Sequence, residues 1–330
     1  MKKLETLLND IPFESLPPEW SEFNFERFSR SKSLWDYQQR ALRNALKALW
    51  KYFTADSTAN QAERNRALFG CYIDNDIHLE DLSLGRKREN AVLLADYYSL
   101  EEDRLPYWQI VNRMGFWMAT GSGKTLVIVK LLELLWGLIR RGCIPANDIL
   151  VLTHREDLLR QLRQHVEEFN ASGGELYIRL HELKEYPEVK RSFPRLLGAH
   201  EISVFFYRSD NLSDEQKEKI VDFRNYDNNG HWYVLLDEAH KGDKEDSKRQ
   251  HIYSILSRNG FLFNFSATFT DPRDILTTAS EFNLSSFIQA GYGKHISILK
   301  QENRAFRRDE DYTDEEKQKI VLQSLLLHLS

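Results

Sequence analysis

The chain has 330 residues, and its 45 lysines and arginines against 50 aspartates and glutamates give a formal charge of −5. This length allows about two domains at roughly 150 residues each, and a hydrophobic content of 42% excludes wholesale disorder. The slight negative charge excludes a generally polycationic nucleic-acid binder but leaves room for a local basic groove. Two cysteines are too few for a disulfide scaffold or a cysteine-rich zinc site.

The sequence predicts a soluble cytoplasmic protein with no membrane contact. Its first residues, Met-Lys-Lys-Leu-Glu, place charges where a signal peptide needs an apolar stretch. The most apolar window, from Leu126 to Ile139, contains Lys130 and Glu133, so it is not expected to span a bilayer.

Three segments precede the region of regular pattern. Residues 1 to about 33 contain Pro17-Pro18 and several acids, and we expect an irregular lead-in there. From Leu34 to Phe53 the spacing of the leucines predicts an amphipathic helix, which completes a lead-in unit over residues 1–53. Residues 54–112 alternate between polar and aromatic stretches, and we interpret them as an inserted segment, helical in form.

After Arg113 short apolar runs of strand length alternate with helix-length amphipathic segments. Continuous apolar strands between helices are typical of a parallel sheet covered on both faces. We therefore predict an α/β fold with a doubly wound parallel sheet over residues 113–300. The expected strands are Gly115–Ala119, Ile149–Leu152, Ile202–Tyr207, Trp232–Leu236 and Phe261–Phe265, and the expected helices are Lys124–Arg140 and Glu156–Phe169.

The strongest motif is Met-Ala-Thr-Gly-Ser-Gly-Lys-Thr at positions 118–125, between an expected strand and an expected helix. Its glycines let the backbone turn N–H groups toward a triphosphate, and the following helix N-terminus favours the same anion. A strict phosphate-loop pattern has glycine where this chain has Met118, but the strand–loop–helix context supports the same reading. Lys124 is expected at the β- and γ-phosphates and Thr125 at Mg²⁺. The predicted ATP-binding residues of the loop are Thr120, Gly121, Ser122, Gly123, Lys124 and Thr125.

Two carboxylates, Asp237 and Glu238, follow the expected strand Trp232–Leu236. The carboxyl ends of strands in such sheets face the ligand. We expect Asp237 to hold Mg²⁺, usually through water, and Glu238 to orient and deprotonate the attacking water. The alternative is a pair of solvated carboxylates at a strand end.

A third block begins where the expected strand Phe261–Phe265 ends. Ser266 and Thr268 follow it directly. Their hydroxyls are expected to hydrogen-bond His240 and so to couple the nucleotide site to the rest of the molecule.

These blocks, in this order, resemble motifs I, II and III of superfamily 2 helicases and translocases. Upstream, Trp-Asp-Tyr-Gln-Gln at positions 35–39 resembles the adenine-reading Gln motif of that superfamily. Gln38 is the better candidate because it follows the aromatic residue of the motif. A glutamine amide can both donate to and accept from adenine, which would select ATP. The alternative for this glutamine pair is a solvated helix face. Residues 152–161 are similar to motif Ia, which implies that Arg155 contacts a nucleic-acid phosphate.

Within the superfamily, the chain is most similar to the Res subunit of type III restriction–modification enzymes. The likeness rests on Asp-Glu-Ala-His-Lys-Gly-Asp at 237–243 and Phe-Asn-Phe-Ser-Ala-Thr-Phe-Thr-Asp-Pro at 263–272, with Phe-Asn-Leu at 282–284 and Ala-Gly-Tyr-Gly-Lys at 290–294. It covers residues 115–300 firmly and 34–50 loosely. The resemblance implies a RecA-like, DEAH-type P-loop ATPase that uses ATP and Mg²⁺, acts on duplex DNA beside a methyltransferase (Mod) subunit in the bacterial cytoplasm, and forms part of a type III site-specific deoxyribonuclease.

Only 62 residues follow Thr268, whereas a second RecA-like domain needs on the order of 100–150. The Gln-x-x-Gly-Arg-x-x-Arg pattern that would supply an arginine finger is also absent after Thr268. We therefore expect residues 301–330 to begin a connector towards a second RecA-like domain in a longer product, and the chain alone to turn over ATP slowly. Two alternatives stay open, a nucleotide-binding interaction module and an RNA helicase domain.

Overall fold

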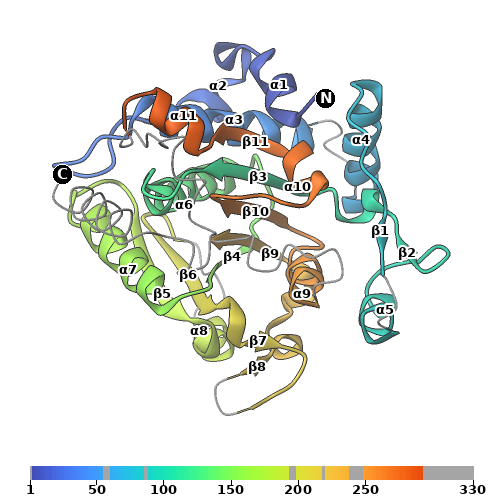
Figure 1. Cartoon of the computed structure of the whole chain (residues 1–330). Helices are drawn as coiled ribbons and strands as arrows, with labels where there is room; N and C mark the ends of the chain where they lie inside the picture. Colours follow the sequence, from blue (N-terminus) through green and yellow to red (C-terminus); the bar gives the residue numbers. More distant parts are fainter. Residues whose placement is uncertain are drawn as a thin grey trace, which may run out of the picture.

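The computed structural model describes residues 2–54, 60–84, 88–192, 198–217, 220–237 and 248–292. A seven-stranded sheet in the order β11-β3-β10-β9-β4-β6-β5 forms its centre, and every neighbouring pair of strands is parallel. Helices flank the sheet (Figure 1). This arrangement confirms the predicted RecA-like α/β class. The predicted roles of Glu238 and His240, and the expected connector 301–330, lie outside the described residues.

The strands of the main sheet are β3 (Arg113–Met118), β4 (Asp148–Thr153), β5 (Tyr177–Glu182), β6 (Glu201–Arg208), β9 (Trp232–Asp237), β10 (Phe261–Ser266) and β11 (Thr278–Phe282). Two short pairs lie outside it, namely antiparallel β1 (Leu82–Ser83) with β2 (Arg104–Leu105) and parallel β7 (Leu212–Ser213) with β8 (Val221–Asp222). The α-helices are α1 (Leu4–Asn9), α2 (Pro18–Ser21), α3 (Asp36–Thr54), α4 (Gln61–Asp74), α5 (Arg88–Ala95), α6 (Lys124–Arg140), α7 (Glu156–Asn170), α8 (Tyr186–Ser192), α9 (Lys248–Leu256), α10 (Pro272–Leu276) and α11 (Leu284–Gln289).

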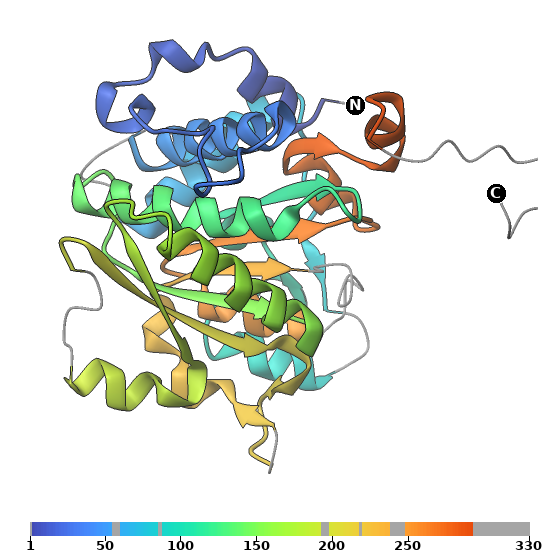
Figure 2. The ribbon, with the colours of Figure 1, turned by 90° about the vertical axis from the view of Figure 1, so that its left-hand side faces the viewer.

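Helices α6 and α7 lie over one face of the sheet, with α3 beside α6 (Figure 2). Helix α9 packs against β9 from the opposite face (Figure 1). Helix α6 is apolar on nearly every side because it contacts α3 and α7 as well as the sheet. Between neighbouring strands, the rings of Phe116 and Phe265 stack with centroids 4.3 Å apart. The strand on which the phosphate motif begins is therefore fixed in the centre of the core.

Most predicted elements are present with small shifts at their ends. Helix α6 has the predicted bounds, whereas β3 ends at Met118, one residue before the prediction. Strands β5 and β11 were not predicted. Strand β5 is at the edge of the sheet and carries polar side chains on most of its exposed positions. Strand β11 contains two small polar residues, Thr278 and Ser280, that are nevertheless buried. Neither has the continuous apolar pattern of a central parallel strand.

The N-terminal segment is more regular than the expected irregular lead-in. It contains α1 and α2, and α1 buries Leu4 and Leu8, which are four residues apart and so share one face of the helix. Helix α1 covers the edge strand β11, where Glu5 Oε1 accepts a hydrogen bond from the Glu281 N–H at 3.0 Å. Lys3 Nζ forms an ion pair with Glu281 at 2.6 Å. The free edge of β11 is thus occupied by the beginning of the chain.

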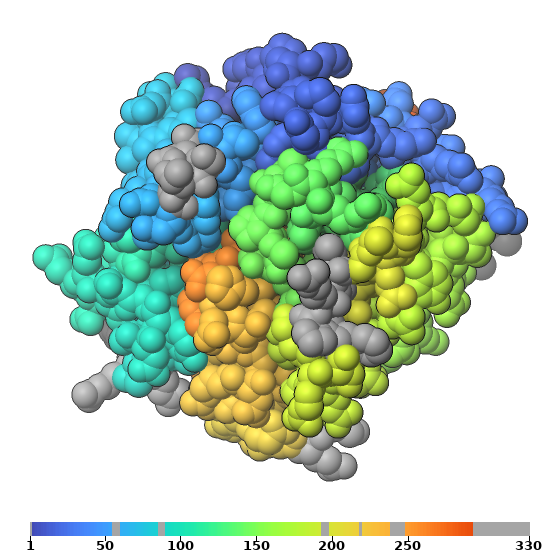
Figure 3. All heavy atoms as spheres, turned by 180° about the vertical axis from the view of Figure 1, so that it is seen from behind, coloured from blue at the N-terminus to red at the C-terminus, as the bar shows by residue number. Residues whose placement is uncertain are grey.

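The segment from residue 60 to 112 connects two parts of the fold. Its helix α4 contacts α3, and its helix α5 contacts α9. The Tyr98 hydroxyl donates to the Ser254 carbonyl of α9 at 2.7 Å. From behind, this segment and α9 form one continuous surface (Figure 3). The segment is therefore packed onto the sheet domain at two places, against α3 and against α9.

Candidate functional site: the phosphate loop and its neighbours

The loop between β3 and α6 has the backbone of an anion cradle. Gly121 and Gly123 adopt φ angles of +81° and +77°, in the left-handed region that favours glycine. Ser122 bends the loop back, since its N–H and its hydroxyl both donate to the Ala119 carbonyl, at 3.1 and 2.7 Å. Apart from its own chain neighbours, no described residue has an atom within 4 Å of the position that a Cβ on Gly121 would take. Within the described part of the chain, the loop therefore has open space beside Gly121.

Lys124 begins α6 and is almost fully buried. Its Nζ lies 3.4 Å from the Met118 carbonyl oxygen and 3.5 Å from that of Ala119. These are long, weak contacts, and a phosphate oxygen is a stronger acceptor for an ammonium group. Thr125 follows in the first turn of α6, half-buried. The predicted loop residues 120–125 thus lie together at one helix N-terminus.

The first turn of α3 holds this loop from the side. The Tyr37 hydroxyl donates to the Ser122 carbonyl at 2.7 Å, and Gln38 Nε2 donates to the same oxygen at 2.9 Å. Gln38 Oε1 accepts from the Trp35 N–H at 2.9 Å. With 3% of its surface exposed, Gln38 is not on a solvated helix face, so that alternative is wrong for this residue. Gln39 is half-buried and donates to the Leu34 carbonyl at 2.8 Å.

Tyr37 was not among the predicted site residues, although it lies inside the motif at positions 35–39. Burial raises the pKa of its hydroxyl, and the neighbouring Tyr292 raises it further. The group therefore stays protonated and keeps donating to Ser122 across the physiological pH range.

The contact between α3 and the loop is close. A Cβ placed on Gly123 would lie 2.5 Å from Gln38 Nε2, well inside van der Waals contact. Glycine is therefore favoured at position 123 for two reasons. Its φ is positive, and the Gln38 side chain occupies the space that a Cβ would need.

The acidic residue Asp237 is the last residue of β9 and is buried. It lies in register with Phe265 of β10, and the next residue of β10, Ser266, is in register with Trp117 of β3. Three adjacent strands thus end at the same level. They bring Asp237, Ser266 and the start of the phosphate loop together at the carboxyl-terminal end of the sheet. Figure 1 shows the carboxyl ends of these strands side by side.

Ser266 and Thr268 form a local turn. The Ser266 hydroxyl donates to the Thr268 carbonyl at 2.8 Å, and the Thr268 N–H donates back to that hydroxyl at 3.1 Å. Ser266 is fully buried and Thr268 is exposed. The predicted bond to His240 falls outside the described residues and stays a prediction.

Arg155, the predicted nucleic-acid contact, lies after β4 at the same edge of the sheet and is exposed. Its guanidinium forms a two-pronged contact with Asp157, at 2.9 and 2.8 Å. A nucleic-acid phosphate would therefore have to share or replace Asp157 as the partner of Arg155.

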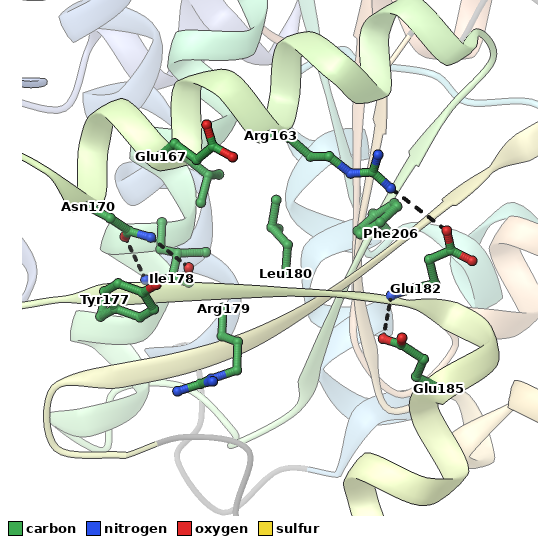
Figure 4. A pocket seen from close by; sticks show the side chains of 11 residues that line it. Arg163, Glu167, Asn170, Tyr177, Ile178, Arg179, Leu180, Glu182, Glu185 and Phe206 are labelled. Carbon is green, nitrogen blue, oxygen red and sulfur yellow. Dashed lines mark hydrogen bonds and ion pairs between the residues drawn. The ribbon is translucent and has the colours of Figure 1, made fainter.

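A hollow lies elsewhere, between α7 and the edge strand β5 (Figure 4). Several of its polar side chains are engaged with the protein. The Asn170 side chain exchanges two 2.9 Å hydrogen bonds with the Ile178 backbone, and Arg163 lies 3.7 Å from Glu182. The lining carries charges of both signs. This chemistry does not favour a phosphate ligand there.

The residues at the phosphate loop fit a nucleoside triphosphate with Mg²⁺. A glycine turn with a positive φ, a lysine whose contacts to the described residues are long, and a helix N-terminus are the groups that bind β- and γ-phosphates. The Thr125 hydroxyl and the Asp237 carboxylate are oxygen donors, the ligand type that Mg²⁺ prefers.

The family model of the type III restriction enzyme, res subunit, matches residues 31–271 of the chain. This range includes the phosphate loop, Asp237 and most of the main sheet. No curated protein matches the chain. Among the described residues, none of the helices has both the length and the hydropathy that crossing a membrane requires.

Proposed function

The chain belongs to the family of type III restriction enzyme res subunits, and from that premise we propose that it is a motor domain coupling ATP hydrolysis to movement on, or cleavage of, duplex DNA. Membership makes it a helicase-like ATPase domain of a restriction subunit. One observation carries the proposal. The loop that leads from β3 to Lys124, and the buried Asp237 that ends β9, lie at the same carboxyl-terminal end of the sheet.

Each residue has a role in ATP hydrolysis. The backbone of residues 120–123 binds the phosphates, and Lys124 moves from its carbonyl contacts to the β- and γ-phosphate oxygens. Gln38 offers its second amide N–H to the adenine. Thr125 and Asp237 hold Mg²⁺, which when bound neutralises negative charge on the phosphate oxygens. Glu238, next in the chain, takes the proton of the attacking water.

The coupling and DNA-binding roles extend this proposal. Ser266 and Thr268, with His240, transmit the state of the nucleotide to the neighbouring elements. Arg155 contacts a DNA phosphate in place of Asp157. The partners that the family implies are a methyltransferase (Mod) subunit and a second RecA-like domain, which supplies an arginine finger worth roughly 10³–10⁵ in rate.

The proposal is tested by ATP binding and hydrolysis with the 330-residue chain and its Lys124→Ala variant. Duplex DNA, single-stranded DNA and RNA are compared as activators at several salt concentrations. We expect weak Mg²⁺-dependent ATP binding that Lys124→Ala reduces further, and little DNA-stimulated turnover by this chain alone. Strong duplex-DNA-stimulated hydrolysis by this chain, abolished by Lys124→Ala, would refute the expectation of an incomplete site. RNA as the best activator would contradict the restriction function.

A further inference from the structure

The Trp117 side chain joins the strand of the phosphate loop to the turn that follows β10. Trp117 lies in β3, shortly before Ala119, where the loop begins. Its indole N–H donates to the Ala267 carbonyl at 3.0 Å. Ala267 is the middle residue of the turn that the Ser266 hydroxyl closes by hydrogen bonds with Thr268. One side chain of β3 and one side chain of β10 therefore hold the same turn.

Contacts from other segments fix the direction of the indole. The buried Phe269 ring meets the Trp117 ring edge to face, with centroids 6.1 Å apart at 81°. Lys3 Nζ lies over the same ring, 5.5 Å from its centroid, and an ammonium over an indole face is an attractive contact. Lys3 also forms its ion pair with Glu281, the residue of β11 in register with Trp117. The indole is therefore held by two separate segments, and its N–H keeps one direction.

Burial alone does not explain the bond to Ala267. A buried indole usually finds a partner for its N–H, which is the ordinary reason for such a bond. Trp117, however, is only half-buried, and the bond is only partly buried. Water could therefore satisfy the Ala267 carbonyl if the indole were absent. What distinguishes this bond is its place, at the turn that carries two of the residues proposed to couple the nucleotide site to the rest of the molecule.

We propose that Trp117 is a positioning residue that transmits nucleotide binding from the phosphate loop to the Ser266–Thr268 turn. This inference rests on the proposed ATP-binding function and assigns its coupling step to a residue of the strand before the loop. Phosphates bound to the backbone of residues 120–123 hold the loop in one conformation, and with it the end of β3. Since the Trp117 indole is bonded to Ala267, a fixed end of β3 also fixes the turn. ATP binding then raises the local stability of the turn.

Hydrogen exchange of the turn with and without ATP tests this coupling. Exchange of the amides of residues 267–269 is followed by mass spectrometry for the 330-residue chain and for Trp117→Phe, which keeps an aromatic ring and loses the N–H donor. Calorimetry first gives the ATP concentration that saturates each protein in the presence of Mg²⁺. In the parent chain we expect ATP to slow this exchange about 2- to 10-fold, the factor that one hydrogen bond supplies. In Trp117→Phe we expect an unchanged ATP affinity and the loss of this slowing.

Trp136→Phe is the matched control. The Trp136 indole also donates to a backbone carbonyl, that of Gly198 at 3.2 Å, and a cation also lies over its ring, the Arg140 guanidinium at 4.7 Å. Trp136 is in the last turns of α6, at the end of the helix away from the phosphate loop. This variant is expected to keep both the ATP affinity of the parent and the slowing of exchange by ATP.

The outcomes separate the coupling from the nucleotide site. Exchange that ATP still slows in Trp117→Phe would overturn the inference, because the coupling then does not pass through the indole. The same holds if Trp136→Phe also loses the slowing, or if Trp117→Phe loses ATP affinity, since Trp117 would then act on the loop itself. A parent chain that binds ATP without slower exchange at the turn would refute the coupling and leave the ATP site intact. A parent chain that binds no ATP would contradict the proposed nucleotide function itself.

Discussion

The Tyr37 hydroxyl donates a hydrogen bond to the Ser122 carbonyl at 2.7 Å, although 85 positions separate the two residues. The carbonyl also accepts from Gln38, so two consecutive side chains of α3 hold the turn of the phosphate loop. The loop geometry therefore depends on a helix outside the strand–loop–helix unit.

Tyr37→Phe removes one of these two donors and leaves the ring packing in place. We expect the free energy of unfolding to fall by about 0.5–1.5 kcal/mol and ADP affinity to fall about 2- to 10-fold, because the loop is less well fixed. Urea unfolding and calorimetry measure the two effects. Tyr52→Phe is the control, since it also removes a buried tyrosine hydrogen bond, to Asn65, away from the loop. Equal loss of ADP affinity in both variants would contradict a specific role for Tyr37.

Lys124→Ala removes the ammonium group at the loop. A hydrogen bond to a charged group contributes about 1.5–3 kcal/mol, so we expect ATP affinity to fall about 10- to 100-fold. Calorimetry with ATP measures this change, and circular dichroism checks that the variant is folded. Lys184→Ala, at an exposed lysine, is expected to bind ATP like the parent. An unchanged ATP affinity in Lys124→Ala would show that the nucleotide binds elsewhere.

Gly123→Ala and Gly121→Ala separate backbone strain from crowding. Both glycines have a positive φ, so each alanine costs about 1 kcal/mol or more in backbone strain. Among the described residues, the alanine at position 123 would also meet Gln38 Nε2 at 2.5 Å, whereas the alanine at 121 would meet no atom within 4 Å beyond its chain neighbours. We expect Gly123→Ala to lower the melting temperature more than Gly121→Ala. Adding Gln38→Ala to Gly123→Ala should recover part of the difference, and no recovery would contradict the contact.

His165 on α7 provides a pH-dependent contribution to stability. Burial lowers its pKa, the Lys32 ammonium lowers it further, and Glu168 acts in the opposite direction. Its ring meets Phe28 edge to face at 6.2 Å. The folded-state pKa of His165 lies below the unfolded value of about 6.5. The neutral His165 ring therefore contributes fully to the free energy of unfolding above that pH, and this contribution is lost as the pH falls through the folded-state pKa.

His165→Phe keeps a ring against Phe28 and removes the titration. We expect its unfolding free energy to change less than that of the parent between about pH 8 and pH 5. Urea unfolding at a series of pH values measures the difference. His200→Gln, at an exposed histidine, is the control. The same pH profile in His165→Phe and the parent would refute the contribution.

The phosphate loop and the acidic strand end were predictable because each is encoded in a few consecutive residues. The loop needs one strand, one turn and one helix, and Lys124–Arg140 has the predicted bounds. The contact of the Trp117 indole with the Ala267 carbonyl was not predictable in this way, since it depends on how β3 and β10 bring distant residues together. Strand β11 itself is hidden by its composition, because Thr278 and Ser280 are polar yet fully buried. The Thr278 hydroxyl is satisfied locally by the Asp274 carbonyl, whereas the burial of the residue depends on the pairing of β11 with β3, more than 150 positions away.

Strand β3, on which the phosphate loop begins, lies between β10 and β11, the last strands of the described chain. The Ala119 N–H at the start of the loop donates to the Phe282 carbonyl at the end of β11. During synthesis, β3 therefore leaves the ribosome long before either of its neighbours and waits as an apolar strand with both edges open. Nucleotide stabilises only a chain that can bind it. A nucleotide can therefore stabilise the complete loop only after Phe282 has been made.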